Sequence, residues 1–318
     1  MSKRVFIDGE AGTTGLQIVE RLRRIDGVVV QSLDLHARKD NAARRAMMAS
    51  VDLVVLCLPD EAAREAADMV EGLGGAAPRL LDASSAHRIS RGWTYGFSEM
   101  APEQPQAIAQ ATRVSNPGCY PTGAIALLKP LVEAGLVPAD FPITINAVSG
   151  YSGGGKSLIA DHHSAGGPAF ELYGLSLNHK HVPEIAHHAG LARRPLFVPS
   201  IGHFRQGMLV SVPLHLDALP GRPTAREIGC ALVDRYDGAT QVKVRMTPAE
   251  QRLDAEGAAG SDVMELFVFE NEAESQAVLV ARLDNLGKGA AGAAVQNIGL
   301  MLGLDARSAA AGKVAMHA

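Results

Sequence analysis

The first 120 residues of this 318-residue chain alternate short apolar runs with segments of helical periodicity. Short connections of this kind join parallel strands to helices through right-handed crossovers. The nearly continuous apolar run Val51–Leu58, which ends at Pro59, is typical of a strand that is covered on both faces. The apolar runs predict strands at 5–8, 28–30, 51–58, 80–81 and 112–115. This part of the chain is therefore predicted to form a Rossmann-type, doubly wound parallel sheet of the α/β class.

The second half of the chain has a different pattern. After a helix that begins at Cys119 and ends near Gly135, longer and more alternating strands replace the short apolar runs. We expect these strands at 143–148, 196–199, 208–216, 263–269 and 278–281, and further helices at 224–235 and 290–302. The sequence therefore predicts a second domain of the α+β type with a mixed or antiparallel sheet.

A glycine-rich loop follows the first strand. Gly9, Gly12 and Gly15 are spaced GxxGxxG between that strand and a helix, and Thr13 and Thr14 lie in the same loop. Backbone N–H groups at such a helix start can bind a phosphate group. The spacing departs from the GxGxxG dinucleotide pattern, so a plain tight turn is the alternative. The loop is a candidate cofactor site.

Two further features lie at the carboxyl ends of predicted strands, where open α/β sheets bind their ligands. Arg38 and Lys39 follow the second strand and suit the 2′-phosphate of NADP, with a solvated charge cluster as the alternative. Ser84 and Arg88 lie in the polar loop after the strand at 80–81. We expect ligands to bind near this loop.

A turn around Cys119 is the candidate for covalent chemistry. Pro and Gly in Ser115–Gly123 form a tight turn, and the apolar residues after it predict a helix that opens at the cysteine. The N–H groups and the dipole of a helix N-terminus stabilise a thiolate and lower the pKa of the thiol. A buried small hydrophobe is the alternative. Cys119 is therefore a candidate nucleophile.

The segment Gly150–Ser157 matches the P-loop pattern GxxxxGK[ST] and follows a strand. A nucleotide-binding P-loop normally joins the first strand of a parallel α/β domain to its helix, whereas here the parallel units come earlier in the chain. A glycine turn that binds a substrate phosphate with Lys156 is the preferred interpretation. A purely structural loop is the other alternative.

Two histidines, His179 and His181, are two residues apart and are followed by Glu184. Such a pair could bind zinc, but the further ligands would have to come from elsewhere. Acid–base chemistry fits better, because Glu184 could orient a histidine whose pKa is near neutrality. His203 is a rival candidate, with Arg205 beside it to bind an anionic group.

Composition excludes several classes of function. The net charge of −4 provides no basic field for nucleic acid, and no apolar run reaches the roughly 18 residues that suggest a membrane span. Cys57, Cys119 and Cys230 are widely spaced without a CxxC pair, so neither a disulfide framework nor a structural zinc site is indicated. We expect a cytoplasmic protein without a metal, whose partners are small molecules and copies of itself.

Taken in order, six segments of this chain resemble the short form of the N-acetyl-gamma-glutamyl-phosphate reductase family. They are the glycine loop and residues 115–122, 150–157, 179–185, 197–208 and 284–297. The family is related to the aspartate-semialdehyde dehydrogenases, which share the thiol chemistry and the GxxGxxG loop. The resemblance spans nearly the whole chain.

The resemblance implies NADP(H) as cofactor, Cys119 as nucleophile and His181 as acid and base. His203 stays open as the acid/base group, since the aspartate-semialdehyde enzymes carry their histidine after a Val-Pro segment. Asn116 is expected to stabilise the oxyanion. Expected cofactor contacts are Gly9, Gly12, Thr13, Thr14, Gly15, Arg38, Ser84 and Asn285. Expected substrate contacts are Arg88, Ser149, Lys156, His179, Glu184 and Arg205.

The resemblance also implies the reaction and the division of labour. We expect NADPH-dependent reduction of N-acetyl-gamma-glutamyl phosphate to N-acetylglutamate 5-semialdehyde and phosphate through a Cys119 thioester, in arginine biosynthesis. Residues 1–118, completed by a C-terminal helix over 286–318, are expected to bind NADP. Residues 119–285 are expected to carry catalysis and substrate binding and to form a homo-oligomer, a dimer or tetramer. The alternatives are another amino-acyl-phosphate reductase, such as an aspartate-semialdehyde dehydrogenase, and a P-loop nucleotidase using 150–157.

Overall fold

A computed structural model describes residues 2–164, 166–246 and 251–304. The described residues divide into two compact units, each of which has its own sheet. One unit contains Met1–Ser98, Pro102–Pro117 and Ala290–Ala318, and the other contains Glu99–Ala101 and Gly118–Gly289. Of the helix expected over 286–318, the part from residue 305 onward lies outside the described residues.

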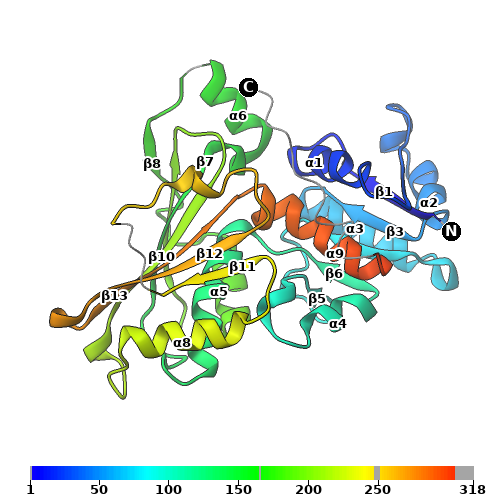
Figure 1. The fold of residues 1–318 in the computed structure, drawn as a ribbon. Coiled ribbons are helices and arrows are strands. Elements are labelled where there is room, and N and C mark those ends of the chain that lie inside the picture. Colours follow the sequence, from blue (N-terminus) through cyan, green and yellow to red (C-terminus); the bar gives the residue numbers. More distant parts are fainter. Residues whose placement is uncertain (1, 165, 247–250, 305–318) are drawn as a thin grey trace. The chain divides into compact units, whose positions relative to one another are not determined.

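The first unit is built on a parallel sheet, which confirms the predicted Rossmann-type fold (Figure 1). The described strands follow the order β2-β1-β3-β4-β6-β5 across the sheet. Their bounds are β1 (Lys3–Asp8), β2 (Val28–Gln31), β3 (Leu53–Leu56), β4 (Arg79–Asp82), β5 (Thr94–Tyr95) and β6 (Arg113–Ser115). Because β2 and β3 lie on opposite sides of β1, the chain reverses its winding there, and ligands of open α/β sheets bind at such a point.

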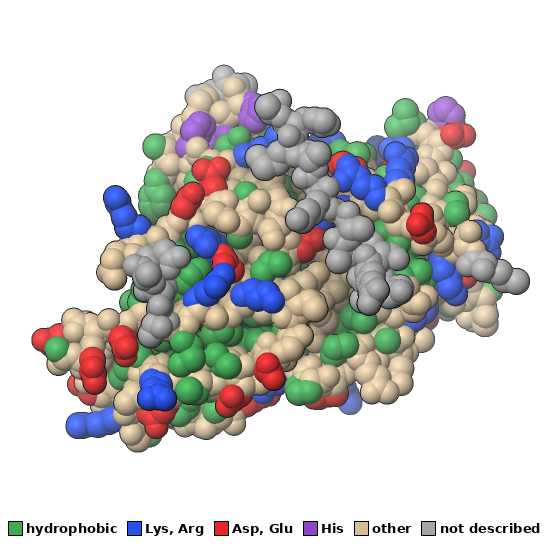
Figure 2. Space-filling model, viewed as in Figure 1, with side chains coloured by type: hydrophobic (Ala, Val, Ile, Leu, Met, Phe, Trp, Pro, Cys, Tyr) green, Lys and Arg blue, Asp and Glu red, His purple; other side chains and the backbone are tan. Residues whose placement is uncertain are grey.

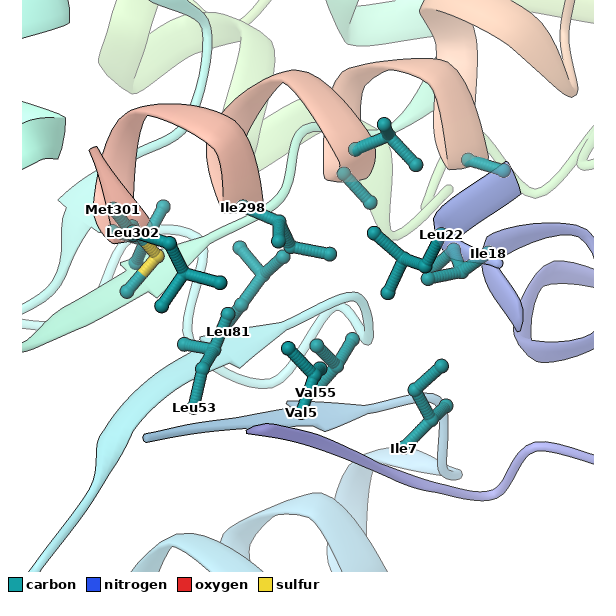
Figure 3. Packing of buried hydrophobic residues seen from close by; sticks show 14 of the residues in the cluster. Val5, Ile7, Ile18, Leu22, Leu53, Val55, Leu81, Ile298, Met301 and Leu302 are labelled. Atoms are coloured by element: carbon teal, nitrogen blue, oxygen red, sulfur yellow. The ribbon is translucent and has the colours of Figure 1, made fainter. Parts of the chain in front are cut away.

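Helix α1 of the first unit buries one face, whereas α9 is buried on nearly all sides. In α1, Ile18, Val19 and Leu22 are buried whereas Leu16 is 52% exposed, as the helical period of its apolar residues requires. The helices are α1 (Thr13–Leu22), α2 (Asn41–Ala49), α3 (Asp60–Glu71), α4 (Gln104–Gln110) and α9 (Gly292–Leu302). Figure 3 shows Ile298, Met301 and Leu302 of α9 packed with α1 and the sheet, so the C-terminal helix completes this core.

The second unit is built on a mixed sheet, as predicted. Its described strands follow the order β11-β12-β13-β10-β7-β9-β8, with parallel pairs at β11–β12 and β7–β9 and antiparallel pairs elsewhere. The strands are β7 (Thr144–Gly150), β8 (Phe170–Leu172), β9 (Leu196–Gly202), β10 (Met208–His215), β11 (Val242–Arg245), β12 (Met264–Asn271) and β13 (Gln276–Leu283). The edge strands β8 and β11 are additions to the prediction, because runs this short carry little periodic signal.

One face of this sheet is covered by helices. A Cβ atom at Gly123 of α5 would lie 2.9 Å from Val210 Cγ2, so only a glycine lets α5 approach β10 this closely. Thr224 and Glu227 form a capping box that starts α8. The helices are α5 (Cys119–Glu133), α6 (Gly155–Ser164), α7 (His181–Ala189) and α8 (Ala225–Tyr236). The segment around Lys156, expected to be a glycine turn, is thus a 3-10 turn (Tyr151–Gly154) followed by α6.

On the face drawn in Figure 2, acidic and basic side chains are interspersed, so neither sign of charge dominates that face. No helix among the described residues combines the length and the apolar character that crossing a membrane requires.

We predict that Ile298→Ala lowers the free energy of unfolding by about 2–5 kcal/mol, because Ile298 is fully buried and the substitution leaves a cavity. Leu16→Ala, which truncates an exposed side chain, is the matched control and should change stability by less than about 0.5 kcal/mol. Urea unfolding followed by circular dichroism measures both. Equal stabilities for the two variants would contradict the assignment of α9 to this core.

Candidate active site

Cys119 is the first residue of α5, and Gly118 is its N-cap in an extended conformation. Gly118 has no side chain with which to cap the helix, and the positive end of the α5 dipole lies at Cys119, whose side chain is only partly buried. This arrangement favours a thiolate. The strand, the turn and the helix around Cys119 occur where the sequence predicts them.

Glu184 ties α7 to the turn before the cysteine. Its carboxylate is 2% exposed, and Oε1 accepts a hydrogen bond from the N–H of Gly118 at 2.8 Å. His181, the first residue of the same helix, is 6% exposed, and its ring lies 5.9 Å from the ring of Tyr120. Since Tyr120 follows Cys119 in the chain, the starts of α5 and α7 are neighbours. Glu184 therefore positions the turn here, and its expected role in contacting substrate stays a prediction.

His179 is held as a neutral ring. Its Nδ1 accepts the backbone N–H of His181 at 3.1 Å, so its proton must be on Nε2, which lies 3.5 Å from Tyr173 Oη. Burial, with a smaller contribution from the charge of Lys180, lowers the pKa of His179 to about 4. This ring orients the start of α7, while its expected contact with substrate stays a prediction.

His203, the rival acid/base candidate, is hydrogen-bonded to another histidine. Its Nδ1 lies 2.8 Å from His162 Nδ1, so one ring donates and the other accepts. The two rings stack at 5.0 Å, and Tyr151 stacks on His162 at 4.6 Å. His162 is only 4% exposed. His203 thus belongs to a ring cluster over α6, whereas His181 contacts the residue next to Cys119.

Asn285 joins two loops of the second unit. Its Oδ1 accepts the N–H of Gly207 at 2.8 Å, and its Nδ2 donates to Ser152 Oγ at 2.9 Å. Ser149 is buried nearby, where its Oγ donates to the carbonyl of Gly150 at 3.1 Å. These bonds give Asn285 and Ser149 structural roles, and their expected ligand contacts stay predictions. Lys156, in the first turn of α6, and Arg205, between β9 and β10, are exposed cations.

Gly289 makes room for the thiol. A Cβ atom at this position would lie 2.8 Å from Cys119 Cβ, so a larger residue would push against the cysteine. The N–H of Gly289 donates to the carbonyl of Asp284 at 2.9 Å, which fixes this approach. Burial raises the pKa of Asp284, and Gln206 and the N–H groups of Leu286 and Gly260 donate to its carboxylate. The sequence contained a signal for this close approach, because the residues that follow Lys288 are small.

The glycine loop of the first unit fits a phosphate-binding role. Gly9 has φ +91°, and a Cβ atom there would lie 2.3 Å from the carbonyl oxygen of Cys57. A Cβ atom at Gly15 would lie 2.6 Å from the carbonyl oxygen of Gly9. Thr13 and Thr14 begin α1, and its N-cap residue, Gly12, has no side chain with which to cap the first N–H groups. The loop therefore presents bare backbone at a helix start, as dinucleotide binding requires.

Cys57 differs from Cys119 in its chemistry. Desolvation, together with the carboxylates of Asp82 and Asp8, raises the pKa of its thiol to about 12. It packs against the core of the first unit, as the sequence indicates. The environment of Cys57 therefore keeps it protonated and unreactive.

A histidine–aspartate hydrogen bond that sequence reasoning missed joins the loop after β4 to the last residue of that strand. His87 Nδ1 lies 2.7 Å from Asp82 Oδ2, and its ring stacks on Trp93 at 4.0 Å. Ser84 Oγ donates to the same carboxylate at 2.8 Å, so its expected contact with cofactor stays a prediction. The polar character of the loop was visible in the sequence, but the pairing of His87 with Asp82 was not.

Asn116 and Arg88 meet at the end of β6. Arg88 Nε donates to the carbonyl of Asn116 at 3.0 Å, and Asn116 Nδ2 donates to the carbonyl of Ala290 at 3.1 Å. Asn297 Nδ2 donates to Asn116 Oδ1 at 3.0 Å. Asn116 is 1% exposed and is thus part of a buried network, while its expected role at an oxyanion and that of Arg88 at the substrate stay predictions.

The end of β2 carries the expected cation. Arg38 lies beside Glu10 of the glycine loop and forms an ion pair with its carboxylate, whereas Lys39 is exposed. Within residues 2–164, 166–246 and 251–304, no group of three or more His, Cys, Asp or Glu side chains is arranged to hold a metal ion.

Comparison with known proteins identifies relatives along the whole chain. The family described as "Semialdehyde dehydrogenase, dimerisation domain" matches residues 119–285. The N-acetyl-gamma-glutamyl-phosphate reductase of Brucella ovis is 50% identical over 313 residues, which cover 95% of this chain and 100% of the relative. The protein of the same name from Chelativorans sp. is 49% identical over 309 residues, which cover 95% of this chain and 99% of the relative.

Solved structures share the fold at low sequence identity. Aspartate semialdehyde dehydrogenase II from Vibrio cholerae, solved with the ligand abbreviated ASA, has a TM-score of 0.68 at 17% identity and covers 95% of this chain and 98% of its own. The Candida albicans aspartate semialdehyde dehydrogenase with NADP has a TM-score of 0.63 at 13% identity and covers 95% of this chain and 99% of its own. At these identities the likeness establishes the fold alone.

The neutral His179 ring predicts a pH dependence of stability. In the unfolded chain the pKa of histidine is about 6.5, whereas in the folded chain that of His179 is about 4. As the pH falls, His179 is therefore protonated in the unfolded chain before it is protonated in the folded chain. The contribution of the neutral ring to the free energy of unfolding is complete above about pH 6.5 and is lost as the pH falls toward 4. We predict that His179→Gln loses less stability than the parent over this range in urea unfolding.

The exposed His215 provides the control, because His215→Gln removes an imidazole that folding leaves in water. This control should keep the parent's pH dependence. If His179→Gln and the parent lose stability in parallel between pH 6.5 and 4, the assignment of a neutral His179 is wrong.

Proposed function

The chain belongs to the N-acetyl-gamma-glutamyl-phosphate reductases, enzymes of arginine biosynthesis, and from this premise we propose that Cys119 carries the acyl group during turnover. The reaction reduces N-acetyl-gamma-glutamyl phosphate to N-acetylglutamate 5-semialdehyde and releases phosphate. The observation that supports Cys119 is its place at the first residue of α5, beside the helix that carries His181.

In the first half of the reaction, the Cys119 thiolate attacks the acyl carbon, and the carbon–oxygen bond to phosphate breaks to leave a thioester. We propose that His181 accepts the proton of the Cys119 thiol and then donates it to the departing phosphate. His181 is preferred over His203 because the centroid of its ring lies 5.9 Å from that of Tyr120, the residue after Cys119, whereas His203 is hydrogen-bonded to His162. His179 holds the start of α7 and does not exchange this proton.

In the second half, the thioester is reduced and the carbon–sulfur bond breaks to release the aldehyde and the thiolate. NADPH, when bound, supplies the hydride for this reduction. Residues Gly9, Gly12, Thr13, Thr14 and Gly15 would hold its pyrophosphate on backbone N–H groups. Ser84, Arg38 and Asn285 are the further proposed cofactor contacts. The N–H of Cys119 and the amide of Asn116 are the proposed donors to the oxyanion.

The substrate carries a carboxylate and an acyl phosphate, and its binding requires cations. Lys156 at the start of α6 and Arg205 in the segment between β9 and β10 are exposed in the second unit and suit these anions. Arg88 is the proposed contact from the first unit, and Ser149 is the proposed neutral contact. We propose accordingly that the first unit binds NADP and that the second carries catalysis and substrate binding.

The P-loop alternative loses its structural basis. Gly150–Ser157 follows β7, which lies inside the mixed sheet, instead of the first strand of the parallel sheet. The alternative of an aspartate-semialdehyde dehydrogenase rests on solved structures below 20% identity, which establish the fold only.

We also propose that the chain forms a homo-oligomer in the cytoplasm through the open face of the second sheet. Val210 and Ala281 face α5, so Leu209 and Val278, which are an odd number of residues away along the same strands, face the other side. A groove of about 710 Å³ lies on that side. Its apolar lining includes Phe170, Leu172, Val198, Leu209, Phe269 and Val278. The match of residues 119–285 to a dimerisation domain supports this surface.

We predict that Cys119→Ser lowers turnover at least about 1,000-fold, because a serine hydroxyl does not ionise at neutral pH. The assay follows NADP⁺ reduction by N-acetylglutamate 5-semialdehyde in the presence of phosphate. Cys230→Ser, which changes an exposed thiol, is the matched control and should keep full activity. Turnover by Cys119→Ser at the rate of the control, or by the parent without phosphate, would overturn the proposed mechanism.

We predict that Val278→Asp dissociates the oligomer, because a carboxylate would be buried in an apolar interface. Val278 is 39% exposed in the single chain, and Val29→Asp on the first unit, at 42% exposed, is the matched control. Light scattering coupled to size-exclusion chromatography measures both masses. An unchanged mass for Val278→Asp, or an equal loss in the control, excludes this face.

A further inference from the structure

A carboxylate of the glycine loop is bonded to Arg38, the arginine expected to bind a 2′-phosphate, and to Ser32. Glu10 lies two residues after β1, and its two carboxylate oxygens accept hydrogen bonds from Ser32 Oγ at 2.6 Å and from Arg38 Nη2 at 2.5 Å. Arg38 Nε also donates to the carbonyl of Leu33 at 3.2 Å. Glu10 thus links the turn after β1 to the segment after β2, within the first unit.

The hydrogen bonds of Glu10 to Ser32 and Arg38 lie where dinucleotide-binding folds distinguish NAD from NADP. In dinucleotide-binding folds the substituent on the ribose 2′ carbon lies near the end of the second strand. A carboxylate there accepts the 2′-hydroxyl of NAD, whereas an arginine accommodates the 2′-phosphate of NADP. Here β2 ends at Gln31 and is followed by Ser32, so the carboxylate comes instead from the glycine loop. A carboxylate, from Glu10, and an arginine, Arg38, are therefore both present at this position, and they are paired with each other.

We propose that Glu10 is a cofactor-selectivity residue that competes with the 2′-phosphate for Ser32 and Arg38. This inference rests on the proposed function, because it assumes that the glycine loop binds a nicotinamide dinucleotide. Glu10 then weakens the preference for NADP that Arg38 provides. A neutral 2′-hydroxyl, by contrast, can donate to the Glu10 carboxylate and accept from Arg38.

Partial burial strengthens this competition. The Glu10 side chain is 15% exposed and that of Arg38 is 34% exposed, so water screens the carboxylate less than at an open surface. A phosphate dianion bound at Arg38 must displace Glu10 or lie beside a like charge. Repulsion of this kind over a few ångströms corresponds to about a five- to tenfold loss in affinity.

The test compares ligands that differ only at the ribose 2′ position. Adenosine 2′,5′-bisphosphate and adenosine 5′-monophosphate are titrated into the full chain by calorimetry, followed by NADP⁺ and NAD⁺. The variants are Glu10→Gln, which keeps the shape and removes the charge, and Arg38→Gln. Asp34→Asn is the matched control, because it removes the charge of an exposed carboxylate two residues from Ser32.

Glu10→Gln should bind adenosine 2′,5′-bisphosphate and NADP⁺ about five- to tenfold more tightly than the parent and should not tighten binding of the 5′-monophosphate or NAD⁺. Arg38→Gln should weaken binding of the 2′-phosphate ligands about tenfold or more. Asp34→Asn should behave as the parent. These results support the proposal.

Unchanged or weaker binding of adenosine 2′,5′-bisphosphate to Glu10→Gln overturns the inference, and so does an equal gain for Asp34→Asn. If the parent binds NADP⁺ while Glu10→Gln gains nothing, the proposed function survives without this selectivity role. If the parent binds neither NADP⁺ nor NAD⁺, the proposed cofactor site itself fails.

Discussion

A hydrogen bond from the N–H of Gly118 to the buried carboxylate of Glu184 holds together the two helix starts of the proposed active site. Hydrogen bonds to a charged group contribute about 1.5–3 kcal/mol, and removing one partner leaves the other buried and unsatisfied. This bond joins the turn before Cys119 to the first turn of α7, where His181 lies. The proposed nucleophile and the proposed acid and base are therefore linked by a contact between two helix starts.

Close packing around this contact uses small residues and neutral rings. Gly123 lets α5 lie against β10, and Gly289 leaves room for the side chain of Cys119. His179 supports the start of α7 without adding a charge, because its pKa of about 4 keeps it neutral. A positive ring there would lie beside His181 and would disfavour protonation of that histidine. The site thus combines a helix dipole that favours the thiolate with a neutral support beneath the imidazole.

Local patterns made much of this architecture predictable. The parallel sheet followed from short apolar runs and short connections, and the helix at Cys119 followed from turn residues and an apolar run, because each of these signals lies within about 15 residues. Strands β5 and β8 are too short to produce such a signal. The helical start of α6 was hidden by the glycines before Lys156, which are typical of a turn.

Contacts between distant residues could not be read from the sequence. Gly118 and Glu184 are 66 positions apart, and His162 and His203 are 41 positions apart. The role of Glu184 as an acceptor for the cysteine turn, and the pairing that occupies His203, therefore emerge only from the folded chain. The bridge from Glu10 to Arg38 is similar, because its two residues belong to different turns at one edge of the sheet.

Mass spectrometry of the enzyme quenched during reaction with N-acetyl-gamma-glutamyl phosphate, without NADPH, tests the covalent step most directly. The account predicts one N-acetylglutamyl group per chain, located by peptide mapping on the thiol of Cys119 and removed when NADPH is added. Release of phosphate without any acyl group on the protein, or an acyl group on another residue, would contradict it.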